Sequence, residues 1–274
     1  MHAINKKSLL LSCTFFCLAY PQALFAAEKK STWEAGFGIG ALNVPHYLGS
    51  KKYDLYAAPL PYIRYKGEVL KADRKGVRGV LWQSDKVEFS LSTKASLPVD
   101  SDDNELRSGM ADLDPIFEIG PSLSYELYTS ENNAHSVSFE FPIRSAFSFD
   151  GLKISHQGWN LNPKIDYYYA NKNWKLNVNL GPTWANQSYH DYFYGVSNQQ
   201  ATILRPAFSA KKGYTATRFS SSVSYRISDW YIGAFINYYN LQSAANLDSP
   251  LVETNNNFMA GFFVANIFRS NDSN

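Results

Sequence analysis

Seven charged side chains could carry chemistry, because each stands at a polar position of a segment that otherwise alternates apolar and polar residues. They are Glu118, Glu126, Glu140, Arg144, Lys175, Arg218 and Arg226. Acids and bases on one face of neighbouring strands can form ion pairs, which would plug a narrow passage. If the acids instead gather on one wall of the passage and the bases on the opposite wall, they would create a transverse electric field that selects ions. Both arrangements stay open, because strand register decides which side chains meet.

The other polar residues give little support to catalysis. The histidines beyond the N-terminal segment are His46, His135, His156 and His190, and they do not cluster in the sequence. His135 and Ser136 are adjacent, but consecutive strand residues point to opposite faces and cannot act together as base and nucleophile. The chain has no cysteine after Cys17, and its histidines do not cluster. It therefore offers no ligand set for zinc. We therefore expect a protein that is not an enzyme and that has no cofactor.

One stretch is rich in carboxylates and holds Asp100, Asp102, Asp103, Asp112 and Asp114. Such a cluster could bind Ca²⁺ or the Mg²⁺ that bridges lipopolysaccharide. Charge runs of this kind are more often solvated faces, so we interpret this stretch as a solvated acidic loop.

The elements that would position these side chains are long segments of strict two-residue alternation. In residues 174–184, the apolar face consists of Trp174, Leu176, Val178, Leu180, Pro182 and Trp184. A tilted strand needs ~9–11 residues to cross a bilayer, and such a strand separates lipid from a polar interior. The pattern predicts twelve strands, at residues 33–44, 54–65, 68–74, 77–83, 86–98, 115–129, 135–149, 152–170, 174–190, 214–228, 230–241 and 256–268.

The connections between these segments sort by length. With twelve strands, the long connections 45–53, 99–114, 191–213 and 242–255 all fall on one side. The short connections 66–67, 84–85, 130–134, 171–173 and 228–229 fall on the other. Bacterial barrels have short periplasmic turns and longer outer loops. We therefore predict an all-β fold: a transmembrane up-and-down antiparallel β-barrel of twelve strands, with both termini in the periplasm. The segments 68–74 and 77–83 are weakly patterned and could also be one bent strand.

Charge is absent from the predicted lipid face, where Phe117, Ile119, Phe141 and Ile143 stand. An Arg or Lys facing lipid at mid-depth would cost roughly 2–4 kcal/mol. The opposite face consists largely of Ser, Asn, Gly and Thr. This composition suits the narrow polar interior of a barrel, whereas the solvent-exposed face of a soluble β-sandwich would carry more charge.

Residues 1–26 resemble an export signal, with Lys6 and Lys7 before an apolar stretch and small residues at the end. Cleavage there would leave residues 27–274 as the barrel and remove both cysteines, Cys13 and Cys17. Of 26 basic side chains, 24 remain against 24 acidic ones, so no net charge favours nucleic acid as a partner. Aromatic residues make up 16% of the chain, and the last predicted strand ends at Phe268. We expect an outer-membrane protein of a Gram-negative bacterium that contacts membrane lipid and lipopolysaccharide.

Three short strings stand in a characteristic order: 45–50, with Tyr47, Gly49 and Ser50; 192–197, with Tyr192, Gly195, Val196 and Ser197; and 249–252, with Ser249, Pro250, Leu251 and Val252. Together they resemble the MipA/OmpV family of outer-membrane proteins. The resemblance implies a non-catalytic scaffold that joins a murein-cleaving lytic transglycosylase to a murein synthase, or an accessory of the envelope stress response. Both enzymes would then be periplasmic partners. The family has no agreed catalytic residues.

Two other functions compete with the scaffold. Twelve strands enclose a lumen narrower than that of large porins, so a narrow passive pore for small solutes is possible. Loop 191–213 could bind glycans, lipopolysaccharide phosphates or a host surface through its aromatic and basic side chains, Tyr192, Tyr194, Arg205, Phe208, Lys211 and Lys212. Outer loops are commonly polar and variable without such a role. A scaffold has a difficulty of its own, because short turns must supply ~800 Å² for a stable contact.

Overall fold

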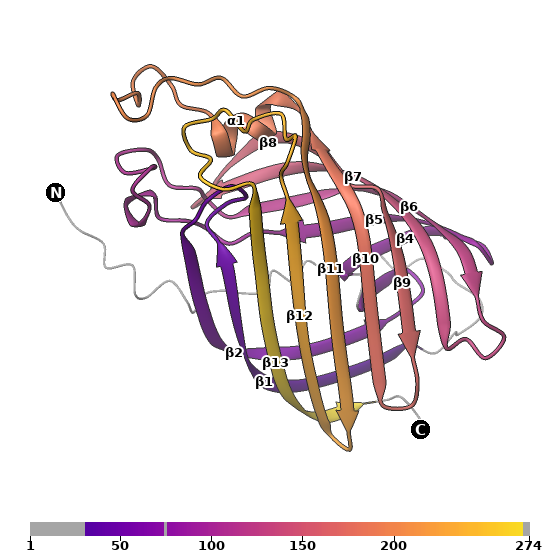
Figure 1. The fold of residues 1–274 in the computed structure, drawn as a ribbon. Helices are drawn as coiled ribbons and strands as arrows, with labels where there is room; N and C mark the ends of the chain where they lie inside the picture. Colours follow the sequence, from indigo (N-terminus) through magenta and orange to yellow (C-terminus); the bar gives the residue numbers. More distant parts are fainter. Residues whose placement is uncertain (1–30, 74–75, 271–274) are drawn as a thin grey trace. The chain divides into compact units, whose positions relative to one another are not determined.

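The computed structural model describes residues 31–73 and 76–270, with side chains as far as Phe268. These residues form an antiparallel sheet that closes on itself (Figure 1). The predicted signal segment 1–26 lies outside the described residues. The described elements are β1 (Thr32–Pro45), β2 (Tyr53–Lys66), β3 (Leu70–Asp73), β4 (Gly76–Gln83), β5 (Val87–Ala95), the 3-10 helix η2 (Ser101–Asp103), β6 (Ile116–Thr129), β7 (His135–Asp150), β8 (Lys153–Leu161), β9 (Lys164–Ala170), β10 (Trp174–Ala185), helix α1 (Gln187–Tyr194), β11 (Gly213–Ile227), β12 (Trp230–Asn240) and β13 (Asn256–Ser270).

The prediction of a twelve-stranded barrel is confirmed, with one extra strand. The expected segment 152–170 is divided into β8 and β9, and both pieces pair with β7. The break falls at Pro163, which has no N–H to donate to a ladder. Beside it, the Asn162 side chain donates hydrogen bonds to Pro182 O and Thr183 Oγ1, each at 2.9 Å. β8 and β9 therefore together occupy the position of a single strand in the barrel.

The expected strand 174–190 is too long and ends at Ala185. Asn186 begins helix α1 instead, because its side-chain Oδ1 accepts a hydrogen bond from the backbone N–H of Tyr189 at 3.1 Å. This is the usual N-cap interaction. The weakly patterned segments 68–74 and 77–83 are two separate short strands, β3 and β4, which pair with each other.

The two faces of the strands follow the predicted alternation. On β6, Phe117, Ile119 and Leu123 are exposed, whereas Glu118 and Ser122 are buried on the opposite face. Exposed apolar side chains also follow the outer face of β7, at Phe141 and Ile143. Among the described residues, no helix has the length and the apolar composition to cross a bilayer.

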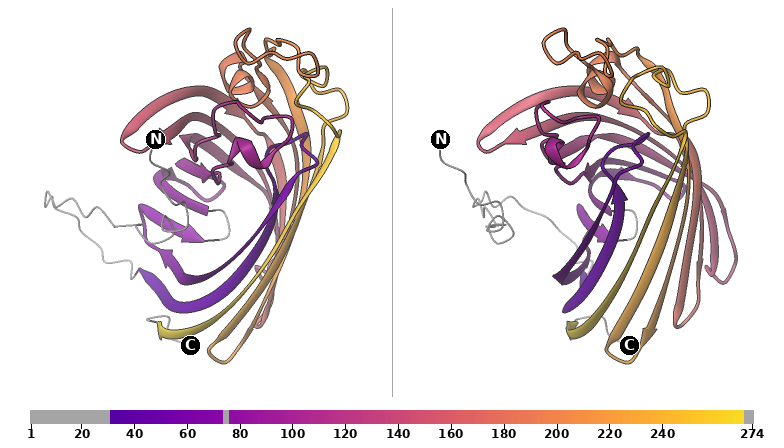
Figure 2. Two further views of the ribbon diagram at one scale, coloured as in Figure 1. Left: turned by 90° about the vertical axis from the view of Figure 1, so that its left-hand side faces the viewer. Right: turned by 60° about the vertical axis from the view of Figure 1, so that its left-hand side comes forward.

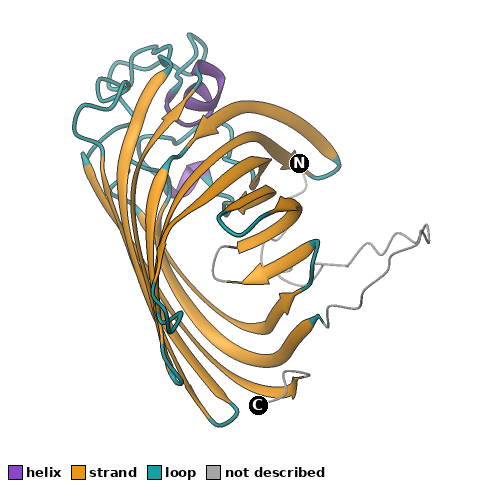
Figure 3. Ribbon diagram, turned by 90° about the vertical axis from the view of Figure 1, so that its right-hand side faces the viewer, coloured by secondary structure: helices purple, strands orange, loops and turns teal. Residues whose placement is uncertain are grey.

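Long connections gather at one end of the barrel, here called the loop end, and short turns at the other, the turn end (Figure 3). The loop end contains the long connections 46–52, 96–115, 186–212 and 241–255, together with the short turn 151–152 between β7 and β8. The turn end contains residues 67–69, 84–86, 130–134, 171–173 and 228–229. The long connections gather at one end as predicted. In bacterial barrels the short turns are the periplasmic ones.

Candidate functional site: a loop cap above a charged lumen

The four long connections form a packed unit at the loop end, here called the loop cap. Its hydrophobic core contains buried side chains from every one of them: Tyr47, Val99, Leu113, Tyr194, Val196, Ala210 and Leu251. Leu251 is fully buried. Because loops usually lie on the surface with few shared contacts, a common core indicates that these four loops hold a fixed shape.

Hydrogen bonds join the three family-like strings inside this core. The Tyr47 hydroxyl donates to Leu251 O at 2.8 Å, and the Ser249 hydroxyl donates to Tyr194 O at 2.8 Å. Burial raises the pKa of Tyr47 to about 12, so the hydroxyl keeps its proton and remains a donor. Half-buried Pro250 and Val252 flank Leu251. Residues about 200 positions apart in the chain thus form one contact.

Gly49 occupies a position that other residues would strain. Its φ of +99° is in the left-handed region, and an added Cβ would lie 3.2 Å from the Val252 side chain. The Gly49 N–H donates to Asn257 Oδ1 at 2.6 Å, and its carbonyl accepts from the N–H of Glu253 at 2.8 Å. Next to it, Ser50 Oγ accepts from Asn104 Nδ2 at 3.2 Å, which ties loop 96–115 to loop 46–52.

The string 192–197 begins within helix α1, which ends at Tyr194. The Gly195 N–H donates to Asp191 O at 2.9 Å and ends the helix, and Val196 exchanges two backbone hydrogen bonds with Phe208. The Ser197 hydroxyl donates to Gln200 Oε1 at 2.9 Å. These side chains shape the loop, whereas the string alone gave no sign of a helix.

Two arginines hold the loops together from inside. Arg205 is buried and donates to the carbonyl oxygens of Leu106 at 2.7 Å and Ser108 at 3.0 Å. Arg107 donates to Ala111 O at 3.0 Å and lies 5.8 Å from the ring centre of Tyr47. Burial lowers the pKa of Arg107, although the group remains a cation at neutral pH.

The structure therefore changes the interpretation of loop 191–213 as a binding surface. Tyr194 and Arg205 are buried, and the Tyr192 hydroxyl donates to Asp114 O at 3.0 Å. Phe208 is half-buried against the core. Of the six side chains considered for binding, only Lys211 and Lys212 are exposed. The expected acidic loop also has internal roles, since Asp112 Oδ1 accepts from the Ser101 N–H at 2.9 Å.

Helix α1 connects the loop cap to the charged lumen. The Tyr189 hydroxyl donates to Glu118 Oε1 at 2.9 Å. Burial and the neighbouring Glu118 raise the pKa of Tyr189 well above its ordinary value, so the tyrosine stays protonated. The helix lies close to β8 because Gly158, with φ +108°, leaves space: an added Cβ would lie 2.3 Å from Asn186 Oδ1.

Three of the seven candidate lumen charges pair with charged residues outside that set. Glu118 lies 3.6 Å from Lys94, and Glu140 lies 2.9 Å from Lys164. Arg226 pairs with the buried Glu34.

The other four have different surroundings. Arg144 donates to Ser92 Oγ at 3.0 Å, and Arg218 donates to Asn179 Oδ1 at 3.2 Å. Lys175 is half-buried within electrostatic range of Glu34. Glu126 is exposed near the turn end, where the register shifts between Glu126 and Tyr128.

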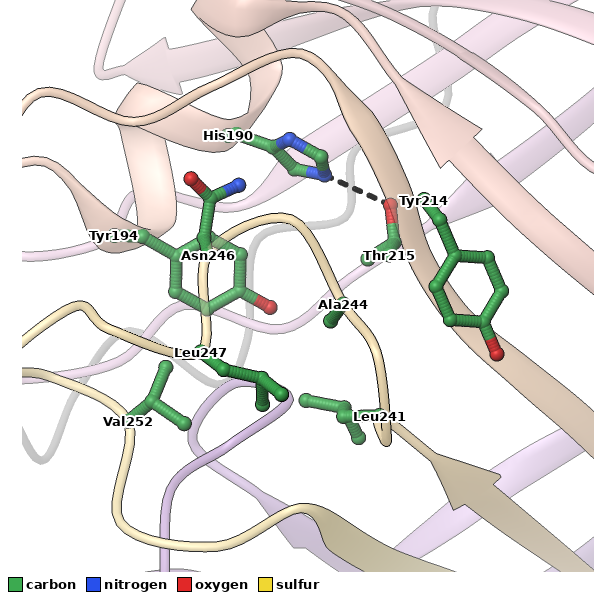
Figure 4. A pocket seen from close by; sticks show the side chains of 9 residues that line it. All are labelled: His190, Tyr194, Tyr214, Thr215, Leu241, Ala244, Asn246, Leu247 and Val252. Atoms are coloured by element: carbon green, nitrogen blue, oxygen red, sulfur yellow. Dashed lines mark hydrogen bonds between the residues drawn. The ribbon is translucent and has the colours of Figure 1, made fainter.

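The histidines occupy separate places. His46 Nε2 lies 3.2 Å from Asp54 Oδ1, His135 Nδ1 lies 2.9 Å from the Tyr167 hydroxyl, and His156 contacts the Phe147 ring. His190 is fully buried beside a cavity with room for about one water, about 10 Å³ (Figure 4). No group of three or more His, Cys, Asp or Glu within residues 31–73 and 76–270 has a metal-site arrangement.

A family model described as MltA-interacting protein MipA matches residues 37–268. The chain belongs to this family. The MltA-interacting proteins of Escherichia coli (strain K12) and Shigella flexneri are each 26% identical to it over 238 residues, which cover 83% of this chain and 86% of each relative. The family and the barrel architecture identify an outer-membrane protein.

Two solved outer-membrane proteins are among the structures to which this chain is similar. The channel DcaP of Acinetobacter baumannii gives a TM-score of 0.38 at 9% identity, covering 90% of this chain and all of that one. The Pseudomonas putida toluene transporter TodX gives 0.35 at 9% identity, covering 88% of this chain and 90% of that one.

Replacing Leu251 with alanine should loosen the loop cap. Removing a fully buried leucine side chain typically costs about 2–5 kcal/mol. We expect proteases to cleave the loops of Leu251→Ala faster, while the barrel keeps its folded electrophoretic mobility, because the strand ladders are unchanged. Leu152→Ala is the matched control, since Leu152 is fully exposed in the short turn after β7. Equal cleavage rates for the two variants would contradict a packed cap.

The loop cap should also loosen in acid through His190. Its Nδ1 lies 2.6 Å from Lys211 O and its Nε2 lies 2.8 Å from Thr215 Oγ1, an arrangement that suits neutral imidazole. Burial lowers the pKa of His190 below its ordinary 6.5. The unfolded loop therefore takes up a proton first as pH falls, so the stabilisation is complete above about pH 6.5 and is lost below it.

We expect protease cleavage of the loops to increase between about pH 7.5 and about pH 5, the range in which histidine titrates. The increase should be much smaller in His190→Gln than in the wild-type protein. His156→Gln, a change at an exposed histidine on β8, should retain it. An unchanged pH profile in His190→Gln would exclude His190 as the cause.

Proposed function

We propose that this protein is a non-catalytic scaffold of the outer membrane that brings a murein-cleaving lytic transglycosylase together with a murein synthase. The observation that carries the proposal is the match to the MltA-interacting protein family over residues 37–268. The named relatives extend this match over most of the chain. The family match would equally support a role in the envelope stress response.

A non-catalytic role agrees with the surroundings of the nucleophiles and bases. His190 is held between a backbone carbonyl and a threonine hydroxyl, and Tyr189 is held by a carboxylate. Groups that are held by internal partners in this way stabilise the structure of the loop cap. The loop cap is also on the wrong side of the membrane for murein, which lies in the periplasm.

A periplasmic partner must therefore bind the turn end. The exposed charged residues there are Lys66, Glu68, Asp85, Lys86, Glu131, Lys172 and Asp229. Both signs are mixed, so a partner with complementary charges could orient on this surface. The turns have only two to five residues each. A stable interface needs ~800 Å² per partner, so the contact would extend over several turns at once.

Reversing charges on these turns should weaken partner binding. We expect the immobilised wild-type barrel, in detergent and in lipid discs, to retain the transglycosylase and the synthase. A variant with Glu131→Lys, Lys172→Glu and Asp229→Lys should retain them several-fold less, because charge complementarity governs encounter and register. The matched control is Lys211→Glu with Lys212→Glu at the loop end. Absence of retention in both detergent and lipid would contradict the scaffold.

A narrow pore is the second candidate, and the interior of β10 and β11 favours it. Small polar side chains face each other there in register, with Asn177 opposite Ser222 and Asn179 opposite Ser220. Near the turn end, Glu34 is surrounded by the cations Arg64 and Arg226.

If the lumen conducts, Glu34→Gln should shift its selectivity toward anions. The change removes the carboxylate that neutralises Arg64 and Arg226 and leaves a net positive constriction. The zero-current potential across a planar bilayer with a salt gradient measures this shift. Glu126→Gln, at an exposed site of the turn end, is the control. No stable single-channel steps from either protein would exclude the pore.

A further inference from the structure

The longest connection of the loop cap, 186–212, forms an open cleft. Both views of Figure 2 show this connection in orange at the top of the molecule, beyond the ends of the strands. The cleft has a volume of about 600 Å³, within the ~300–1,000 Å³ that is typical of small-molecule sites. Its lining includes Asp191, Ser197, Asn198, Gln200, Phe208 and Ser209. Of the six side chains that the sequence suggested for binding, only Phe208 lines the cleft.

Hydrogen bonds hold the lining of this cleft in place. The Val196 N–H donates to Phe208 O at 2.8 Å, and the Phe208 N–H donates to Val196 O at 2.9 Å. Near the end of α1, Asp191 Oδ1 accepts from a backbone N–H of the returning chain at 2.7 Å. Gln200 Oε1 accepts from the Ser197 hydroxyl at 2.9 Å. The cleft is therefore formed before a ligand enters, which reduces the entropy cost of binding.

Several polar groups of the cleft can still form hydrogen bonds. Within the part of the chain that the structure describes, the Asn198 side chain makes no hydrogen bond and the Gln200 amide nitrogen donates none. The Ser209 hydroxyl accepts from Gln187 at 3.3 Å and has its own proton to donate. The second carboxylate oxygen of Asp191 can accept. Donors and acceptors thus lie together around one small volume.

An aromatic ring borders the same volume, and no cation does. Phe208 is half-buried, because it packs against the core of the loop cap and also lines the cleft. The face of such a ring carries the negative part of its quadrupole and therefore attracts C–H groups. Of the described residues around the cleft, none is a lysine or an arginine, and Asp191 adds a negative charge. The cleft therefore disfavours phosphate and other anions.

This combination of groups matches a sugar. Each hydroxyl of a pyranose both donates and accepts, so it can bind amide, hydroxyl and carboxylate groups alike. The C–H face of the same ring can cover a phenyl ring. A purely apolar ligand would instead leave the polar groups of the cleft without partners. We propose that the cleft binds a neutral oligosaccharide, with one pyranose ring on Phe208 and its hydroxyls bonded to Asn198, Gln200 and Asp191.

The position of the cleft limits the source of such a sugar. The long loops of bacterial barrels face the outside of the cell. A free saccharide of the medium and the sugar portion of lipopolysaccharide in the outer leaflet could both reach this site. Murein could not, because it lies in the periplasm. The site is therefore independent of a scaffold surface at the turn end, and failure of the barrel to retain murein enzymes would leave it unaffected.

Saturation-transfer NMR tests sugar binding directly. The full-length barrel is kept in lauryldimethylamine oxide, a detergent without a sugar headgroup, and is mixed with maltotriose or with triacetylchitotriose. We expect saturation transfer to at least one of the two trisaccharides. The transfer should fall at least five-fold in Ala207→Trp, because the indole would fill the cleft from an exposed position of its lining. Pro206→Trp is the matched control, since Pro206 is exposed beside Ala207 but does not line the cleft.

A smaller substitution checks the hydrogen bonds. Asn198→Ala should weaken binding of the same trisaccharide several-fold. Gln199→Ala, at an exposed neighbour that does not line the cleft, should leave it unchanged. The folded electrophoretic mobility of each variant shows that the barrel has assembled. Equal binding by Asn198→Ala and Gln199→Ala would contradict the proposed contacts.

A second arm distinguishes the two sources of sugar. Intact lipopolysaccharide is passed over the immobilised wild-type protein and over the two tryptophan variants. Retention that Ala207→Trp loses and Pro206→Trp keeps would assign the site to the glycolipid. Saturation transfer to a trisaccharide without such retention would assign it to a free saccharide. The proposal is overturned if neither trisaccharide nor lipopolysaccharide binds in a way that Ala207→Trp abolishes. Displacement of the sugar by an equal concentration of inorganic phosphate would also overturn it.

Discussion

Backbone hydrogen bonding in hydrocarbon is the constraint on which the rest of this structure depends. An unpaired N–H or C=O in a bilayer costs several kcal/mol, so a spanning sheet must close. β1 and β13 achieve this closure with a register that runs from Glu34 opposite Ser270 to Asn43 opposite Ala260. On the side away from β1, strand β2 pairs with β3 only at Tyr65 and Lys66 within the described residues. Pro59 and Pro61 stand on the remaining part of β2 and have no N–H that would need a partner there.

The loop cap solves the same problem above the membrane. A buried loop brings polar backbone groups into a core, and each needs a partner. Tyr47, Ser249 and Asn257 supply these partners from their side chains, and Gly49 lets the chain turn where they meet. The family-like strings are therefore distant in sequence but adjacent in space. The packing of the cap accounts for the burial and the hydrogen bonds of Tyr47, Gly49 and Ser249.

Alternation in the sequence was enough to predict the strands, their faces and the sorting of the connections, because a two-residue period reports directly which side meets lipid. Interruptions were harder to predict. Pro163 divides a strand that is otherwise continuous in pattern, and Asn186 begins a helix in a segment whose alternation continues. Local capping and a missing donor decide these points, and the average pattern of apolar residues does not record them.

The partners of the lumen charges were beyond the sequence for a related reason. Lys164 and Glu34, which pair with Glu140 and Arg226, are not among the predicted lumen charges. Pairing across a barrel depends on the stagger between strands, which the alternation leaves undetermined. His190 shows the same limit, because burial of an α1 residue follows from the docking of loops and not from its own helix.

The observed ion pairs bear on whether the lumen charges plug the barrel or create a transverse electric field across it. Arg144 lies within electrostatic range of both Glu118 and Glu140, and each of these acids has a lysine beside it. Opposite charges are therefore interleaved around this part of the lumen, and their fields cancel over short distances. A transverse field needs the two signs on separate walls, whereas here each acid has a cation beside it. The interleaved pairs therefore favour the plug over the transverse field, which agrees with the proposed scaffold more than with the pore.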